Sequence, residues 1–262
     1  MKCAVVKRRQ ERPKKMGSLT IDIGNTRSKA GFFEGEELVA VDFFEQDDTE
    51  SLLGWATNHP VENIILSSVG GVSGFQQTLR ILRERYGRVL ELDATLPLPI
   101  VNEYETPETL GKDRLAAVVG ATVFFPRQAC LVIDAGTCIT IDLIDAKGHY
   151  RGGNISPGLQ MRLRAMHEFT ARLPRPALKW PADWIGRTTD TALQNGALRG
   201  ALLELAGYER LSHDEFGDIN VLLTGGDSHI LAKNWKSQIF VNQNLVLHGL
   251  NKMLTYNVER SE

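Results

Sequence analysis

The spacing of apolar residues along this chain switches between a period of two and a helical period. Alternation rich in β-branched residues predicts a strand that begins at Leu19 and runs into a turn ending at Thr26, and strands at 28–33 and 36–43, the last two joined by a turn at Glu34-Gly35. Apolar residues four, three and four positions apart predict a helix over 73–86. A helix over 48–58 and strands at 62–69 and 88–92 complete a βββαβαβ order. The N-cap of the 48–58 helix is expected at Asp47, Asp48 or Thr49.

The same order of elements begins again in the second half of the chain. A Pro-rich segment at 96–107 and an apolar helix over 115–125 separate the two parts. Strands are then predicted at 130–136, 138–144 and 148–153, followed by a helix beginning near Pro157, a long helix over 189–210, a strand at 220–224 and a last helix over 244–256. Two halves with one element order predict an α/β fold with a cleft between them. We place these halves at 17–112 and 113–262.

One short motif follows the first strand of each half. Asp134-Ala135-Gly136-Thr137 has its counterpart in Asp22-Ile23-Gly24-Asn25-Thr26. Small residues in such a turn expose backbone N–H groups to phosphate oxygens, and a neighbouring carboxylate can hold a cation or its water. Lys29 could add a positive charge. An ordinary hairpin explains either turn alone, whereas the recurrence favours a nucleotide phosphate chain held between two hairpins.

Three further glycine-containing segments are candidate ligand contacts. Gly111-Lys112-Asp113-Arg114 opens a helix, where Asp113 is either a cap or the acceptor of a proton from an attacking hydroxyl. Arg114 beside it either binds an acidic substrate or lies in a solvated first turn. The segment 152–158 suits a tight strand-to-helix connection or a ligand at a helix N-terminus. The segment 224–227 suits an adenine or ribose contact.

Composition excludes several classes of protein. The 262 residues are 42% hydrophobic, enough for a substantial core, and a formal net charge of −2 gives no basis for nucleic-acid binding. No apolar run approaches the roughly 20 residues that span a bilayer, so we expect no membrane insertion. Three cysteines without disulfide or zinc spacing indicate a reduced, cytoplasmic protein. We expect residues 1–16 to be a basic, disordered extension and hypothesise that translation starts at Met16.

Five motifs, in this order, resemble those of the type III pantothenate kinases, in the superfamily of acetate and sugar kinases, actin and the heat-shock ATPases. They are Asp22-x-Gly24-Asn25-Thr26, Gly111-x-Asp113-Arg114, Asp134-x-Gly136-Thr137, Gly152-Gly153-x-Ile155-x-Pro157-Gly158 and Ile185-Gly186-Arg187-Thr188-Thr189. The resemblance covers essentially residues 19–258. It implies a duplicated actin-like (ribonuclease H-like) fold. It also implies ATP-dependent phosphorylation of the primary hydroxyl of pantothenate to 4′-phosphopantothenate, the first step of coenzyme A biosynthesis.

The resemblance further implies roles for individual residues. ATP would be bound by Asp22, Ile23, Gly24, Asn25, Thr26, Arg27, Ser28, Lys29 and Thr137. Pantothenate would be bound by Tyr104, Gly111, Lys112, Asp113, Arg114 and Thr189, with Asp113 as general base. Asp134 would ligate a monovalent cation, K⁺ or NH₄⁺, and Mg²⁺ would accompany ATP, held through water by Asp22 or Asp134. A homodimer with helices of the second half at its interface is implied.

Two departures from the family pattern remove no reacting group. Lys112 stands where the family often has a small residue, and Cys138 stands where Ala is frequent. Two other functions are compatible with the same residues. A kinase for a different small hydroxylated acid or sugar would keep the phosphate turns and reassign Tyr104, Arg114 and Thr189. A non-enzymatic ATP sensor would need no acceptor-side carboxylate, so the presence of Asp113 argues against it.

Overall fold

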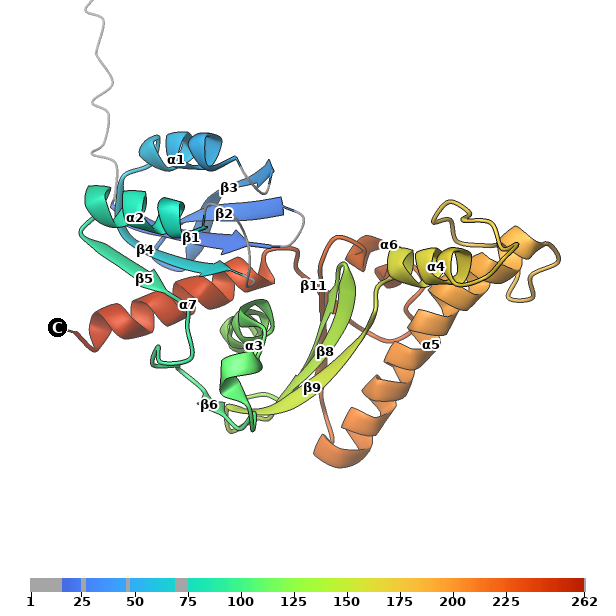
Figure 1. Ribbon diagram of the computed structural model, residues 1–262. Coiled ribbons are helices and arrows are strands. Elements are labelled where there is room, and N and C mark those ends of the chain that lie inside the picture. Colours follow the sequence, from blue (N-terminus) through green and yellow to red (C-terminus); the bar gives the residue numbers. More distant parts are fainter. Residues whose placement is uncertain (1–15, 25–26, 46–47, 69–74, 262) are drawn as a thin grey trace, which may run out of the picture.

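The computed structural model describes residues 16–24, 27–45, 48–68 and 75–261, which form two sheets with helices packed on them (Figure 1). The first sheet has the order β3-β2-β1-β4-β5, with β1 Gly17–Ile23, β2 Arg27–Glu34, β3 Glu37–Glu45, β4 Val61–Ser68 and β5 Arg88–Glu91. The second has the order β11-β10-β7-β8-β9-β6, with β6 Val101–Asn102, β7 Cys130–Ala135, β8 Cys138–Ile144, β9 His149–Pro157, β10 Asn220–Thr224 and β11 Phe240–Val241.

The two sheets repeat one topology. β1 pairs antiparallel with β2 and parallel with β4, and β7 pairs in the same way with β8 and β10. The third strand of each half is antiparallel to the second, and the fifth is parallel to the fourth. The duplicated α/β fold expected from the repeated element order is therefore confirmed.

Three layers of apolar side chains hold the helices to the sheets. Helices α1 (Thr49–Thr57) and α2 (Phe75–Arg85) cover one face of the first sheet. Helices α3 (Lys112–Phe124) and α7 (Leu245–Glu259) lie in the central core, between the sheets. On the far face of the second sheet lie α5 (Thr189–Phe216) and α6 (Ser228–Ala232), with α4 (Leu159–Glu168) packed beside α5 (Figure 1).

The central helices touch backbone to backbone at two glycines. A Cβ atom on Gly249 of α7 would lie 1.8 Å from the Ala116 carbonyl oxygen of α3. A Cβ atom on Gly120 would lie 2.2 Å from the Leu245 carbonyl oxygen. Only glycine permits this approach. The close packing fixes the N-terminus of α3 relative to both sheets.

Most predicted elements are present, and the differences are local. The Asp48 carboxylate accepts a hydrogen bond from Ser51 N (3.0 Å), so Asp48 is the N-cap among the three candidates. Within the segment predicted to be irregular lie β6 and a short 3-10 turn, Pro107–Thr109. The glycine-rich segment 152–158 is mostly strand, because β9 continues to Pro157. The short elements α6 and β11 were not predicted.

Two predictions of organisation stay open. The basic extension 1–15 lies outside the described residues, and the division of the halves at residue 112 remains a prediction. In the part of the chain that the structure describes, no helix combines the length and apolar character needed to cross a bilayer.

Candidate active site

A cavity of about 330 Å³ is lined by residues of both halves, including Asp22 of β1 and Asp134 of β7. The first half contributes charged and aromatic side chains, and the second contributes a carboxylate, a glycine turn and the start of α7. Its lining residues are Asp22, Arg27, Lys29, Phe43, Asp134, Thr224, Gly225, Gly226, His229, Gln243, Val246 and Leu247. The two aspartates of the repeated motif thus face one cavity.

These two aspartates carry an uncompensated charge. Burial raises the pKa of Asp22 to about 6, although a hydrogen bond from the Ser67 hydroxyl (2.7 Å) opposes the shift. Burial raises the pKa of Asp134 to about 7, and the negative charges of Asp113 and Asp22 add to the effect. Desolvation that is not repaid by a partner makes a carboxylate hold its proton. The site therefore favours a ligand that brings positive charge.

Lys29 is a basic side chain whose positive charge acts on both carboxylates. Its Nζ donates a hydrogen bond to the carbonyl oxygen of Gln243 and lies 4.9 Å from the centroid of the Phe43 ring. Burial lowers the pKa of Lys29 to about 8, and Asp22 opposes this shift. Arg27 lies over the same ring, with its Cζ 4.5 Å from the Phe43 centroid. Two cations thus border the aspartates.

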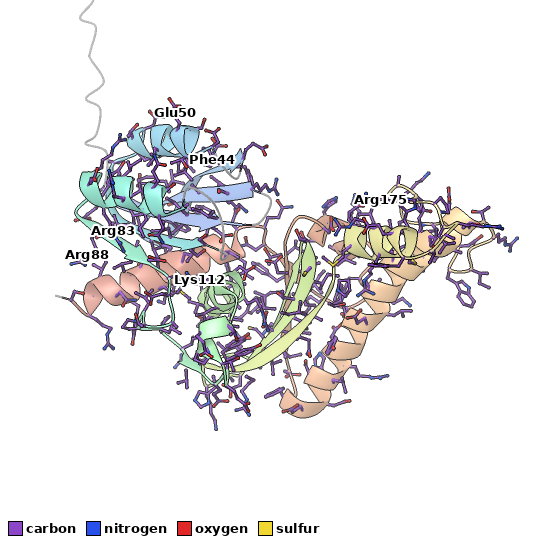
Figure 2. The ribbon with its side chains drawn as sticks, viewed as in Figure 1. Phe44, Glu50, Arg83, Arg88, Lys112 and Arg175 are labelled. Atoms are coloured by element: carbon purple, nitrogen blue, oxygen red, sulfur yellow. The ribbon has the colours of Figure 1, made fainter. Side chains whose placement is uncertain are left out.

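A second cavity, of about 390 Å³, adjoins the first and shares Arg27 and Gly226 with it. It reaches the turn of the second half, including Thr137, and three arginines line it. One of them, Arg175, lies next to α4 in Figure 2. The remaining lining residues are Gly136, Gln160, Met161, Arg164 and Asp227. This combination of backbone turn, hydroxyl and guanidinium groups suits a chain of phosphates.

Asp113 lies in the first turn of α3. Gly111 is the N-cap of this helix, so the capping role considered for Asp113 is wrong. The Asp113 carboxylate accepts a hydrogen bond from Arg114 N (2.9 Å) and folds back over Gly111, where a Cβ would lie 2.6 Å from it. Its charge acts on both Asp22 and Asp134. The charge of Asp113 on α3 therefore acts on the carboxylates of both β1 and β7.

The Arg114 side chain is buried next to Asp113. Its Nε and Nη2 atoms donate to the Asp142 carboxylate at 2.6 to 3.2 Å. Its Cζ lies 5.5 Å from the centroid of the Tyr104 ring. The predicted solvated first turn is therefore wrong for Arg114, whose charge is paired inside the protein.

The type III pantothenate kinase family model matches residues 18–209. The chain is 42% identical over 240 residues to a type III pantothenate kinase of Bacteroides fragilis, covering 92% of this chain and 98% of that protein. It is 37% identical over 248 residues to one of Flavobacterium johnsoniae, with the same shares covered. The chain belongs to the type III pantothenate kinase family. The resemblance stated from the motifs is thus confirmed.

Solved structures with the same fold include more distant proteins. A Campylobacter jejuni protein of the Baf family aligns with a TM-score of 0.61 and 21% identity, covering 92% of this chain and 99% of that one. A ROK hexokinase of Thermus thermophilus aligns with a TM-score of 0.53 and 17% identity, covering 94% and 100%. At these identities the alignments establish the fold alone, and they confirm the duplicated actin-like class that it shares with sugar kinases.

Several residues that the family resemblance implicated lie apart from the cavities. The side chain of Ile23 is in the apolar core, and that of Ser28 is buried. Lys112 pairs with Glu91 (3.7 Å) at the end of β5 (Figure 2). Thr189 is exposed at the start of α5, on the opposite face of the second sheet from α3. Asn25 and Thr26 lie outside the described residues.

Other residues of the site were missed by reasoning from the sequence. They are Phe43 and Gln243 at the cavity, Ser67 beside Asp22, and Asp142 with Tyr150 behind Arg114. Asp142 did give a signal, because it is a carboxylate within an otherwise apolar and hydroxyl-bearing strand. A charge in such a strand needs a partner. The sequence pattern could not indicate which basic side chain pairs with Asp142.

The described residues form no cluster of three or more His, Cys, Asp or Glu side chains able to hold a metal ion by themselves. Asp134 is nevertheless suited to share a cation with phosphate oxygens, because its raised pKa reflects a missing positive charge. Gly225, with φ +90°, brings its backbone against this carboxylate, and a Cβ there would lie 2.4 Å from Asp134 Oδ1. The donor set fits a cation that arrives with a nucleotide.

Proposed function

We propose that this protein transfers the γ-phosphoryl group of ATP to the primary hydroxyl of pantothenate, forming 4′-phosphopantothenate for coenzyme A biosynthesis. The observation that carries the proposal is that Asp22 and Asp134 line one cavity with Arg27 and Lys29, while the charge of Asp113 acts on both carboxylates. Phosphoryl transfer depends mainly on positioning and on stabilising charge. Asp113 on the acceptor side, with Asp22, Asp134 and the two basic side chains on the phosphate side, would provide both.

On the nucleotide side, the two repeated turns hold the phosphates. The first turn and strand, from Asp22 to Lys29, supply backbone N–H groups and the positive charges of Arg27 and Lys29. The second turn supplies Thr137, beside the arginine-lined cavity. The proposal accordingly places the phosphate chain across the boundary between the two cavities, where Arg27 lines both.

Asp134 and the phosphates together would hold a monovalent cation, K⁺ or NH₄⁺, and Mg²⁺ would be bound to ATP oxygens, with water linking it to Asp22 or Asp134. When bound, such cations neutralise the charge that develops on the transferred group. Asp22 and Asp134 fit this role because burial removes water from both carboxylates, and a cation would stabilise their charged forms. Their own task is to orient the cations and the phosphates.

On the acceptor side, Asp113 is the general base. Its carboxylate takes the proton of the pantothenate hydroxyl while that oxygen forms a bond to the γ-phosphorus, and the bond from phosphorus to the β,γ-bridging oxygen breaks to release ADP. Gly111 leaves room for the carboxylate, and α3 is fixed by its glycine contact with α7. Tyr104 and Arg114 bind the rest of pantothenate, with Lys112 at the rim.

Thr189 would join this site only from a second copy of the chain. Within one chain it is separated from Asp113 by the second sheet, since α3 and α5 pack on opposite faces. A homodimer built through the second half resolves this separation. We also propose a cytoplasmic location and a division between the halves at residue 112.

The test is transfer of radiolabel from [γ-³²P]ATP to pantothenate, with and without K⁺. We expect a labelled phosphopantothenate product and a rate that falls when K⁺ is replaced by a bulky organic cation. ADP release measured across hydroxylated acids and sugars separates the alternatives. A faster reaction with a different acceptor would contradict the pantothenate assignment, and bound ATP with no turnover of any acceptor would favour a sensor.

A further inference from the structure

Arg114 and Tyr104, which the proposed function assigns to pantothenate binding, belong to a group of four polar side chains, three of them buried. Arg114 and Asp142 are 4% and 1% exposed, and their closest atoms, Nη2 and Oδ1, are 2.6 Å apart. The hydroxyl of Tyr150 donates to the same Oδ1 atom, also at 2.6 Å. Asp142 thus receives hydrogen bonds from two directions and is fully enclosed.

Tyr104 is the partly exposed member of this group. Its ring stacks on that of Tyr150, with centroids 6.1 Å apart and planes inclined by 6°. The guanidinium of Arg114 lies over the same ring, 5.5 Å from its centroid. Asp142, Arg114, Tyr104 and Tyr150 therefore form a closed circuit, in which each side chain is held by two others.

The surrounding backbone leaves space for this group and holds the segment that carries Tyr104. A Cβ on Gly153 would lie 2.5 Å from Asp142 Oδ1, so only glycine leaves space for the carboxylate. The segment that carries Tyr104 is attached to β9 through β6, and Glu103 forms ion pairs with His149 and Arg151, both at 3.0 Å. The side chain of Asn102 accepts a hydrogen bond from Tyr104 N (3.0 Å).

We propose that Asp142 and Tyr150 are positioning residues for the acceptor site: Asp142 fixes the plane of the Arg114 guanidinium, and Tyr150 fixes both Asp142 and the Tyr104 ring. The inference rests on the proposed function, in which Arg114 and Tyr104 bind pantothenate. A guanidinium held by a two-point contact with a carboxylate keeps one orientation. Misplacing a substrate by about 1 Å can cost a hundredfold in rate, so support behind the binding side chains matters.

The Tyr150 hydroxyl has a second consequence for charge. It shares the Asp142 carboxylate with Arg114, so the carboxylate satisfies Arg114 less completely than it would alone. Arg114 then keeps more attraction for another anion, such as the carboxylate of an acceptor. The group should therefore favour acidic acceptors over neutral ones of the same shape.

The experiment compares Tyr150→Phe with Tyr256→Phe. The first keeps the ring stack and removes the hydroxyl bond to Asp142. The control removes a hydroxyl that accepts a hydrogen bond from Arg260 (3.0 Å) near the C-terminal end of α7. Steady-state KM and kcat are measured for ATP, for pantothenate and for pantothenyl alcohol, in which a neutral hydroxymethyl group replaces the carboxylate.

We expect Tyr150→Phe to raise KM for pantothenate by about 3- to 10-fold, the usual effect of one hydrogen bond. KM for ATP should stay within about twofold of wild type, and KM for pantothenyl alcohol should rise less than that for pantothenate. Tyr256→Phe should change none of the three. Asp142→Asn should also raise KM for pantothenate, because Arg114 loses its fixed orientation, but it should not lower the preference for the acidic acceptor, because it removes the competing carboxylate; if it does not fold, Tyr150→Phe still decides.

Three results would overturn the inference. Equal effects of Tyr150→Phe on pantothenate and on the alcohol would remove the link to the acceptor's charge. An equal rise in KM for ATP would indicate general structural damage, and kinetics like those of Tyr256→Phe would remove any role. In each of these the wild-type protein still phosphorylates pantothenate, whereas a wild-type protein that does not would overturn the proposed function and, with it, this inference.

Discussion

The two halves of the molecule hold the same carboxylate at the same place in the sheet and surround it with different partners. Asp22 of β1 pairs across the sheet with Lys29 on one side and Ser67 on the other. Asp134 of β7 occupies the equivalent position, but its neighbours are Thr140 and Thr224. The backbone has been duplicated, while the chemistry beside it has diverged.

This divergence accounts for the difference between the two pKa values. The Ser67 hydroxyl donates to Asp22 (2.7 Å), and its effect on Asp22 is second only to burial. Lys29 acts on both carboxylates, yet the pKa of Asp22 rises to about 6 and that of Asp134 to about 7. In the first half, the Ser67 hydroxyl stabilises the charged form of Asp22. In the second half, the charged form of Asp134 depends more on a bound cation.

The largest effect should come from Asp113, the negative neighbour that both carboxylates share. Asp113→Asn should lower kcat by roughly two to four orders of magnitude, the usual contribution of a general base. It should also lower the pKa of Asp22 and Asp134, because a nearby negative charge is removed. Steady-state kinetics measures the first effect. The matched control is Asp48→Asn, which keeps an N-cap on α1 and should leave kcat unchanged.

A rate for Asp113→Asn within about threefold of wild type would remove Asp113 from the role of base. The effect of the Asp113 charge on its two neighbours would then be tested by their pKa values alone. These can be followed for Asp22 and Asp134 by NMR titration of the carboxyl carbons.

The next effect concerns a buried charge that only the second half carries. Asp142 on β8 stands where the equivalent position of β2 is Gly31, and it is paired with Arg114. Arg114→Ala should lower the free energy of unfolding by about 3–5 kcal/mol, because it leaves a buried carboxylate without its partner. Urea denaturation at pH 7.5 measures this loss.

A double variant, Arg114→Met with Asp142→Leu, should recover most of the stability and none of the pantothenate affinity. Replacing both members of a buried pair by apolar side chains is often neutral. If Arg114→Ala unfolds at the same urea concentration as wild type, the pair contributes no stability, and its geometry serves binding alone.

The duplication was predictable from the sequence because hydrophobic alternation and the repeated Asp-x-Gly turn are both local signals. Strand β8 is found at its predicted bounds, Cys138–Ile144, and the antiparallel meander follows from the turn at residues 35–36. The two-residue strands β6 and β11 were not predictable, since two residues carry no period. The extension of β9 to Pro157 was masked by glycines that suggested a loop.

The site, like the fold, was predictable from the sequence only in part. The convergence of Asp22 and Asp134 could be inferred because both belong to one repeated motif. The partnership of Arg114 with Asp142 could not, because the residues belong to different elements and only the packing of α3 on the second sheet brings them together. The separation of Thr189 from Asp113 likewise depends on which face of the sheet each helix covers.

A smaller effect should distinguish the two aspartates through pH. Both native carboxylates have raised pKa values, so each is protonated in the native state where it is already ionised in the unfolded chain. The resulting cost is absent below pH 3.8, grows as pH rises, and is complete above about 6 for Asp22 and about 7 for Asp134. Asp134→Asn should therefore raise the free energy of unfolding by roughly 1–3 kcal/mol at pH 8 and leave it nearly unchanged at pH 4.

The gain from Asp22→Asn should be smaller and complete by about pH 6. Urea denaturation without nucleotide and with a bulky organic cation in place of K⁺ gives both profiles. Adding MgATP and K⁺ should reverse the order, because the wild-type carboxylates then have partners. A loss of stability in Asp134→Asn that is equal at pH 4 and pH 8 would contradict the charge argument.

The smallest expected effect comes from Ser67→Ala, which tests why the pKa of Asp22 is lower than that of Asp134. Ser67→Ala removes a hydrogen bond that favours the charged form of Asp22, so it should raise the pKa of Asp22 from about 6 toward the value of Asp134. The expected loss of stability is about 1 kcal/mol at pH 8 and less at pH 5, where Asp22 is largely protonated. Thr224→Val, at the equivalent position of β10, is the control and should leave the titration of Asp22 unchanged. If the pKa of Asp22 does not move in Ser67→Ala, the hydroxyl is not what separates the halves, and the next source to test is the charge of Asp142, which raises the pKa of Asp134.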